Sequence, residues 1–324
     1  MLIRVVATFL SLCACAAPVY AAQAEKFPIR PVRVVVPSTP GGGLDVMARI
    51  MAPQLIERWG QQVVIDNRAG AGGIIGTDIV AKSAPDGHTL LIVTTGFTTN
   101  PLLISKLPYK TPDDFEPITP VGNTPVVLVA HPSLPVRNAK ELVALAKEQP
   151  GKLVFASSGT GTGGHLTMAL LQSVANIKFN HVPYKGAGAS TVAVVSGEAQ
   201  LLFTATSAAL PQIKAGRLRP LVVTSARRVS MLPDVPSVVD AGLPGCVMEQ
   251  WYGFIAPAKT PKALIDRIYA DILVVMKQPD VSARLQAAGF ALNGMPPAQF
   301  RQYLLDEMKN WDMVIKEAGL RGKQ

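Results

Sequence analysis

A strand, a glycine loop and a helix start follow one another in Val32-Arg33-Val34-Val35-Val36-Pro37-Ser38-Thr39-Pro40-Gly41-Gly42-Gly43-Leu44-Asp45. The valine run predicts a buried β-strand, and the prolines and glycines break it. From Leu44 to Trp59 apolar side chains recur at helical spacing, which predicts a helix with one buried face. The members of that face are Leu44, Met47, Ala48, Met51, Leu55, Ile56 and Trp59.

The same order of strand, glycine-rich loop and helix recurs along the chain. Further glycine-rich loops span 67–73, 157–165 and 184–188, each after a predicted strand and before a predicted helix. Alternating strands and helices predict an α/β fold with mainly parallel sheets. Similar units lie before and after about residue 122, so we expect two domains of like build. We place domain 1 at 25–122 plus 248–324 and domain 2 at 123–247.

Composition excludes several classes of protein. The 324 residues are 48% apolar, which is too many for a disordered chain, and 6% aromatic, which is few for a protein that stacks on single-stranded nucleic acid. The net charge of +9 leaves nucleic acid or a small anion as candidate partners. Basic residues do not gather with aromatic ones, so a small anion is favoured over nucleic acid.

The N-terminal segment reads as an export signal. Arg4 is followed by a short apolar run, Val5–Leu12, and then by small residues with two candidate cleavage boxes ending at Ala21 and Ala24. We therefore expect a signal peptide over 1–24 and a periplasmic mature protein. A lipid anchor on Cys15 is the alternative to ordinary cleavage. The mature chain would keep only Cys246, so its fold has no internal disulfide.

Glycine loops at strand ends are typical of anion sites. Glycine lets the backbone turn its N–H groups toward a ligand, and the start of a helix adds free N–H donors and a partial positive charge. A single such loop is most often a tight turn. Four of them at the carboxyl ends of parallel strands indicate a binding edge for a phosphate or carboxylate.

Nucleotide, metal and catalytic motifs are missing. Residues 159–164 match G-x-G-x-x-G, but no acidic residue lies between Glu148 and Glu198 to bind a ribose, and no phosphate-loop lysine motif occurs. The four histidines lack metal-ligand spacing, and no G-x-S-x-G motif makes Ser157 or Ser158 a nucleophile. We expect no cofactor, no metal and no catalysis.

Three polar side chains near the loops have two interpretations each. Lys185 lies at a strand end and could face either a ligand anion or solvent. His165 lies at a helix start and could donate to a carboxylate or act as a cap. Asp45 could fix the loop over 40–43 or receive a donor of the ligand.

A series of motifs resembles the Bug receptors, which are the substrate-binding proteins of tripartite tricarboxylate transporters. The resemblance runs in order from about Phe27 to the C-terminus. It rests on Pro37–Asp45 with Ala48-Arg49, Asn67-Arg68-Ala69-Gly70-Ala71-Gly72-Gly73 with Gly76, Pro85-Asp86-Gly87-His88-Thr89-Leu90, Asn100-Pro101-Leu102, Val182-Pro183-Tyr184-Lys185-Gly186, Leu210-Pro211-Gln212-Ile213-Lys214-Ala215-Gly216 and Leu232-Pro233-Asp234-Val235-Pro236-Ser237.

The resemblance implies a two-domain periplasmic binding protein of the Venus flytrap type, which closes on a small carboxylate. By motif position, the loops 39–45 and 95–98 supply one wall, and the loop 157–165 with Lys185 and Gly186 supplies the other. We expect the ligand-binding residues to be Thr39, Pro40, Gly41, Gly42, Gly43, Leu44, Asp45, Thr95, Gly96, Phe97, Ser157, Ser158, Gly159, Gly161, Thr162, Gly163, His165, Lys185, Gly186 and Thr204.

Departures from the family pattern bear on the ligand. The family often has an aromatic residue at Ser38, a hydroxyl residue at Leu44 and an aspartate at Thr204. These departures indicate a different or more apolar ligand, such as an aromatic or longer aliphatic carboxylate. The implied partners are membrane transporter subunits, and we expect a monomer that does not span the membrane. A ligand sensor for a membrane kinase and a secreted hydrolase are the alternative functions.

Overall fold

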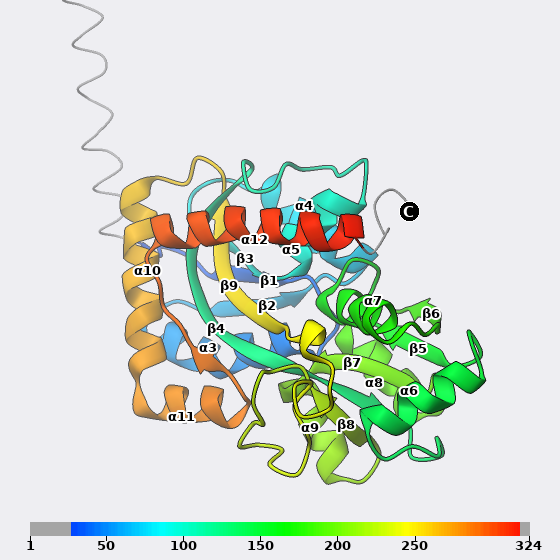
Figure 1. The fold of residues 1–324 in the computed structure, drawn as a ribbon. Helices are drawn as coiled ribbons and strands as arrows, with labels where there is room; N and C mark the ends of the chain where they lie inside the picture. The colour runs from blue at the N-terminus through cyan, green and yellow to red at the C-terminus, as the bar shows by residue number, and fades with distance from the viewer. Residues whose placement is uncertain (1–26, 318–324) are drawn as a thin grey trace, which may run out of the picture.

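The computed structural model describes residues 27–317, and the expected signal peptide lies outside them. The strands fall into two groups that share the long strand β4, Phe115–Ala130 (Figure 1). The first group adds β1 (Val32–Val36), β2 (Val63–Asn67), β3 (Thr89–Thr94), β9 (Glu249–Pro257) and β10 (Ala291–Leu292). The second adds β5 (Val154–Ser157), β6 (Asn180–Pro183), β7 (Leu201–Ala205) and β8 (Arg219–Val223).

Helices cover both groups of strands. Those beside the first group are α3 (Gly43–Trp59), α4 (Ile74–Ala81), α5 (Gly96–Leu103), α10 (Lys262–Lys277), α11 (Pro279–Ala287) and α12 (Pro297–Glu317), with the short 3₁₀ turn η1 (Ala71–Gly73). Those beside the second group are α6 (Ala139–Glu148), α7 (Gly163–Ala175), α8 (Ala187–Val195) and α9 (Thr206–Lys214), with η2 (Pro244–Cys246). No helix within 27–317 is both long and apolar enough to cross a membrane.

The strands pair in parallel in the outer part of each group and antiparallel where the two groups meet. The neighbours β2, β1 and β3 are parallel, as are β6, β5 and β7. Every antiparallel pair in the described residues involves β4 or β9, the strands that lie between the two groups. The predicted strand–loop–helix units therefore form the parallel part of each group, and the strands that join the groups are antiparallel.

The first half of β4 was not predicted from the sequence because it contains prolines. We expect a strand at Val126–Ala130, whereas β4 begins at Phe115. Pro117 and Pro120 cannot donate ladder hydrogen bonds, and the register with β9 shifts beside both of them. Pairing with β9 over nine positions maintains the strand despite these interruptions.

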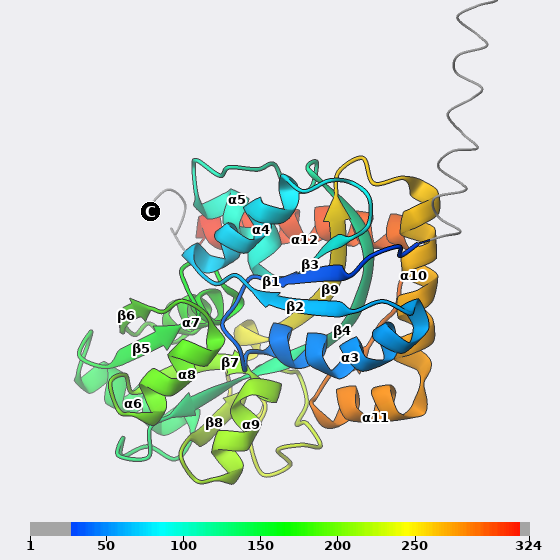
Figure 2. The same ribbon diagram turned by 180° about the vertical axis from the view of Figure 1, so that it is seen from behind.

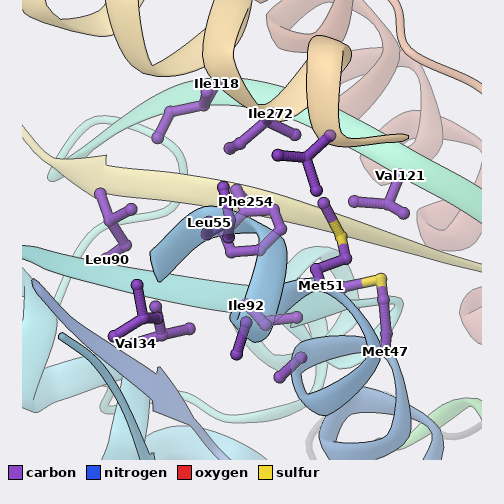
Figure 3. Close-up of a cluster of buried hydrophobic side chains, with 14 of the residues drawn as sticks. Val34, Met47, Met51, Leu55, Leu90, Ile92, Ile118, Val121, Phe254 and Ile272 are labelled. Atoms are coloured by element: carbon purple, nitrogen blue, oxygen red, sulfur yellow. The ribbon is translucent and has the colours of Figure 1, made fainter. Parts of the chain in front are cut away.

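The predicted face of α3 packs in the main hydrophobic core. Met47, Met51 and Leu55 are buried against side chains of β3 and β9, including Ile92 and Phe254 (Figure 3). Helix α10 closes this core from the far side through Ile272 and its neighbours. Burial of a large apolar side chain stabilises the fold by about 1.5–3 kcal/mol. The start of α3, and with it the glycine loop, is thereby fixed relative to the strands.

One expected loop is a helix. We predict a polar loop over 95–100, whereas Gly96–Leu103 forms α5. The hydroxyls of Thr98 and Thr99 donate to the carbonyl of Thr95, and Thr98 also donates to Glu307 of α12 at 2.8 Å. This contact with a helix two hundred residues away stabilises a segment of weak helix propensity.

Candidate ligand-binding site

A cavity of about 70 Å³ lies between the two groups of strands, where α3, α5, α7 and α8 begin. Its size suits a small molecule. None of the side chains that line it is charged at neutral pH. They are Pro37, Ser38, Gly43, Leu44, Gly72, Gly73, Thr77, Val93, Thr94, Gly96, Phe97, Asn100, Ser158, Thr162, Gly164, Gly186, Ala187, Phe203, Thr204, Ala205, Gln250 and Tyr252.

Three helices begin at this cavity, and each has residues of its N-terminus in the lining. The N-cap residues Gly42, Thr95 and Thr162 give α3, α5 and α7 no side-chain cap. The first N–H groups of a helix lack partners within it and carry part of the helix dipole's positive charge. These helix starts therefore bring partial positive charge to a cavity whose lining has no lysine or arginine side chain.

Three residues of the lining have a buried polar side-chain atom without a partner. In the described residues the hydroxyls of Thr94 and Thr204 and the side-chain oxygen of Asn100 make no hydrogen bond. Thr204 and Asn100 are almost fully buried. A buried polar group left unpaired costs about 1–3 kcal/mol. These atoms are suited to pair with a bound molecule or with water that accompanies it.

The strand β9 contributes a polar pair to the cavity. The Tyr252 hydroxyl donates to Oε1 of Gln250 at 3.0 Å. Burial raises the pKa of Tyr252, so the hydroxyl keeps its proton. Because that bond occupies Oε1, the amide nitrogen of Gln250 remains as a donor at the cavity. A Cβ added to Gly43 would lie 2.6 Å from the Tyr252 oxygen, so this strand and α3 approach too closely for a larger residue.

Asp45 fixes the first glycine loop. Its carboxylate accepts the amide of Gly41 at 3.0 Å and the side-chain amide of Asn67 at 3.0 Å, and it pairs with Arg49. Burial by itself would raise the pKa of Asp45, but these bonds from Arg49, Gly41 and Asn67 hold it below its usual value. Asp45 does not line the cavity. Of its two interpretations, the structure shows the loop-fixing one.

His165 fixes the loop of the opposite wall. Its Nδ1 accepts the amide of Gly161 at 3.3 Å, and its ring stacks on His181 with centroids 4.4 Å apart. Burial lowers the pKa of both rings to about 4, and for His181 the neighbouring His165 adds to the effect. Both histidines are therefore neutral at physiological pH, and His165 acts as a cap acceptor.

Ser157 forms a serine–histidine pair that the sequence did not reveal. Its hydroxyl lies 2.6 Å from Nε2 of His181 and also accepts the amide of Gly159. Ser157 has no exposed surface and does not line the cavity. The pair holds the loop over 157–165 from within the second group of strands.

Eight of the expected ligand-binding residues line the cavity. They are Gly43, Leu44, Gly96, Phe97, Ser158, Thr162, Gly186 and Thr204. The other twelve lie in the same loops but outside the lining. They are Thr39, Pro40, Gly41, Gly42, Asp45, Thr95, Ser157, Gly159, Gly161, Gly163, His165 and Lys185. Lys185 is exposed and borders a separate hollow with Thr160 and Tyr184.

Several lining residues are missing from the expected set. Gly72, Gly73 and Ser38 lie in glycine loops that the sequence does single out, so loop membership was a usable signal for them. Thr94 precedes the segment expected to be a polar loop, and Asn100 is the last residue of that segment. Gln250 and Tyr252 had no local signal, because β9 reaches the cavity only through long-range pairing with β3 and β4.

The chain matches a known family over most of its length. Residues 47–320 match the model of the tripartite tricarboxylate transporter family receptor, TctC. The chain belongs to the TctC family. The resemblance to Bug receptors in its motifs is thereby confirmed. The described residues contain no group of three or more His, Cys, Asp or Glu side chains placed to hold a metal ion.

Relatives of this TctC receptor cover nearly its whole length. It is 36% identical to protein BugT of Bordetella pertussis, over 99% of this chain and 98% of that protein. The solved structure of the periplasmic binding protein BugD has a TM-score of 0.88 at 31% identity, with 91% of this chain and 99% of that chain covered. The expected fold class, an α/β two-domain periplasmic binding protein, is confirmed.

Two further similar structures contain carboxylates. A Rhodopseudomonas palustris protein determined with adipate has a TM-score of 0.88 at 33% identity, with 90% of this chain and 98% of that chain covered. MatC from the same organism, determined with malate, has a TM-score of 0.85 at 30% identity, with 89% and 100% covered.

Proposed function

We propose that this receptor captures a small carboxylate in the cavity between its two walls and delivers it to a tripartite tricarboxylate-type membrane transporter. The observation that carries the proposal is a neutral cavity onto which three uncapped helix starts converge. Such a site attracts an anion through backbone N–H groups. The adipate and malate found in two similar structures support a carboxylate as that anion.

Backbone donors alone can supply the affinity that a transport receptor needs. A hydrogen bond to a charged group contributes about 1.5–3 kcal/mol net. A micromolar dissociation constant corresponds to about 8 kcal/mol. A few amides of α3, α5 and α7 therefore suffice, and no lysine or arginine is needed in the lining. A ligand that contacts both walls favours the closed arrangement, and the membrane partner binds that arrangement.

The rest of the cavity favours a ligand with a mostly uncharged remainder. Phe97, Phe203 and Val93 contribute apolar surface, and Leu44 lies at the start of α3. At Thr204, where the family often has an aspartate, a threonine lines the cavity instead. A second charged group has no cation to pair with there. This agrees with the more apolar ligand that the sequence indicates.

A melting-temperature screen tests the proposal. The purified protein is heated with mono- and dicarboxylates of increasing chain length, with aromatic acids, and with the primary amide of each acid as its matched neutral control. We expect at least one carboxylate to raise the melting temperature and its amide to have no effect. Equal shifts from acid and amide, or no shift from any acid, would contradict a carboxylate receptor.

The unpaired hydroxyl of Thr204 provides a matched test of the site. Thr204→Val removes only that hydroxyl, so we expect about tenfold weaker binding of the identified carboxylate and little change in stability. Thr206→Val is the control, because its hydroxyl donates to the carbonyl of Pro125. We expect Thr206→Val to lower stability and leave affinity unchanged. The reverse pattern would move the site away from Thr204.

Export to the periplasm, a monomeric state and the absence of catalysis belong to the same proposal. The buried Ser157–His181 pair is the arrangement nearest to a nucleophile, and it does not line the cavity. We expect no hydrolysis of ester or amide substrates by the purified protein. Turnover that disappears in Ser157→Ala would instead establish a hydrolase.

A further inference from the structure

The start of α8 receives its cap from the opposite side of the cleft. Its N-cap residue, Gly186, has no side chain to supply one. Instead the hydroxyl of Thr39, in the loop between β1 and α3, accepts the amides of Gly188 at 3.1 Å and Ala189 at 3.4 Å. Ser38 accepts the amide of Ala187 at 3.4 Å. Figure 2 shows this loop of the first group reaching the α8 region of the second.

Glycine makes this approach feasible. A Cβ on Gly186 would lie 2.7 Å from the backbone nitrogen of Thr39, and one on Gly188 would lie 2.3 Å from the carbonyl oxygen of Pro40. Both distances are shorter than real Cβ contacts. The backbone of α8 therefore touches the opposite loop directly, with no room between them for a ligand or a side chain.

A second contact joins the two sides at α5. The hydroxyl of Thr99 donates to the carbonyl of Gly161, in the loop before α7, at 2.7 Å. Thr99 is fully buried. Here too the backbones are close, because a Cβ on Gly159 would lie 3.0 Å from the Cα of Gly72. Neither Thr39 nor Thr99 lines the cavity.

We propose that Thr39 and Thr99 form a two-point latch that holds the walls closed through the protein's own hydroxyls, with no ligand present. They are positioning residues, because they act on the arrangement of the walls and touch no bound molecule. The latch contributes equally to the binding of every ligand, so it sets affinity and leaves selectivity to the cavity. This inference deepens the proposed function and rests on it, but its test uses the unliganded protein.

Hydrogen–deuterium exchange in the absence of ligand measures the latch. The amides of Gly188 and Ala189 are protected by Thr39 only while the walls are closed. A neutral hydrogen bond of ordinary strength changes such an equilibrium by about fivefold. We expect Thr39→Val to speed exchange at these amides by about that factor. We expect Thr99→Val to do the same, although Thr99 makes no hydrogen bond to α8.

The effect of Thr99→Val separates a latch from a local cap. If Thr99 stabilises only its own surroundings, exchange at Gly188 and Ala189 stays at the wild-type rate, and the proposal is overturned. Thr167→Val is the matched control. Its hydroxyl donates to the carbonyl of Gly163 within α7 and does not cross the cleft. We expect it to leave exchange in α8 unchanged.

Serine variants and solution scattering keep the test decisive if a valine variant does not fold. Thr39→Ser and Thr99→Ser retain the hydroxyls, so we expect wild-type exchange from both. We also expect the radius of gyration of unliganded Thr39→Val to exceed that of the wild type. An unchanged radius of gyration together with unchanged exchange at Gly188 and Ala189 in Thr39→Val would overturn the latch. Failure of every carboxylate to bind would overturn the proposed function and leave these ligand-free results intact.

Discussion

Two glycine loops of the binding cleft, one in each wall, make the same hydrogen bond to acceptors of different charge. In the first wall the amide of Gly41 donates to Asp45, and in the second the amide of Gly161 donates to His165. In both, a glycine with φ near +80° donates to a side chain four residues later. In both, that side chain belongs to the third residue of its helix. The acceptor is an anion in one wall and a neutral ring in the other.

The same loop shape is therefore fixed by an anion in one wall and by a neutral ring in the other. Asp45 is stabilised as an anion by Arg49 and Asn67. Burial keeps the ring of His165 neutral, and the rings of His181 and Phe155 stack with it. In each wall the side chain that fixes the loop is hydrogen-bonded to residues of that same wall. The helix starts are therefore left as the source of positive potential in the cleft.

The two arrangements respond differently to acid. The folded-state pKa of each histidine is lowered to about 4, so each histidine's contribution to stability is complete above about pH 6.5 and is lost as the pH falls toward 4. The pKa of Asp45 is lowered from 3.8, so its contribution is lost only at still lower pH. On acidification the second wall weakens before the first.

The largest expected effect comes from the histidine pair. The two lowered pKa values together predict a loss of about 4 kcal/mol between pH 8 and pH 5, roughly 2 kcal/mol for each ring. The double variant His165→Asn/His181→Gln keeps polar atoms near Nδ1 and Nε2 but does not titrate. We expect urea unfolding to show the wild type losing about 4 kcal/mol more than this variant over that range. Parallel pH curves would mean that the rings take up protons at the same pH in the native state as in the unfolded chain.

Asp45→Asn tests the charged acceptor of the first wall. The same asparagine can replace His165 in the second wall, so the two variants can be compared directly. At pH 7 we expect a loss of about 3 kcal/mol, because Arg49 and Asn67 lose a charged acceptor. His165→Asn places the same side chain at the equivalent position of the other wall, where no charge is removed. We expect His165→Asn to cost less than Asp45→Asn in urea unfolding. Equal costs would show that the charge of Asp45 is unimportant.

Glu307 is a second titratable residue of the first wall, and its contribution to stability changes with pH in the direction opposite to that of the histidines. It accepts from Thr98 of α5 and from the indoles of Trp251 and Trp311. Burial raises the pKa of Glu307 to about 7 despite these bonds. The folded state therefore binds the proton more tightly than the unfolded state does, and this contribution to stability falls as the pH rises from about 4.5 to 7.

Glu307→Gln isolates that contribution. Between pH 5 and pH 8 we expect the wild type to lose about 2.5 kcal/mol relative to the variant. The contribution of the histidines changes in the opposite direction over this range, so the two partly cancel in the stability of the wild type measured against pH. A thermal unfolding series on wild type, Glu307→Gln and the histidine double variant separates them. If the Gln variant tracks the wild type at every pH, Glu307 is already ionised at pH 5.

Local patterns in the sequence predicted the parts of the fold that local physics determines. The stripe on α3 packs as its spacing predicts. Asparagine favours the N-cap position, and Asn138 before α6 accepts the amide of Glu141 at 2.9 Å. The glycine loops lie at the cleft because strand ends in a parallel sheet share an edge. Helix α5 and the polar pair on β9 were missed, since contacts with α12 and with β3 and β4 determine them.

The smallest expected effect concerns Lys185, the lysine of the second wall for which the sequence left a ligand contact open. Its side chain is exposed and borders an outer hollow, while the cavity lining is neutral. An exposed charge outside the cavity is screened by solvent and salt. We therefore expect Lys185→Ala to weaken carboxylate binding by no more than about twofold in calorimetry at physiological salt. A tenfold loss that persists at high salt would place Lys185 in the site and give the second wall a charge after all.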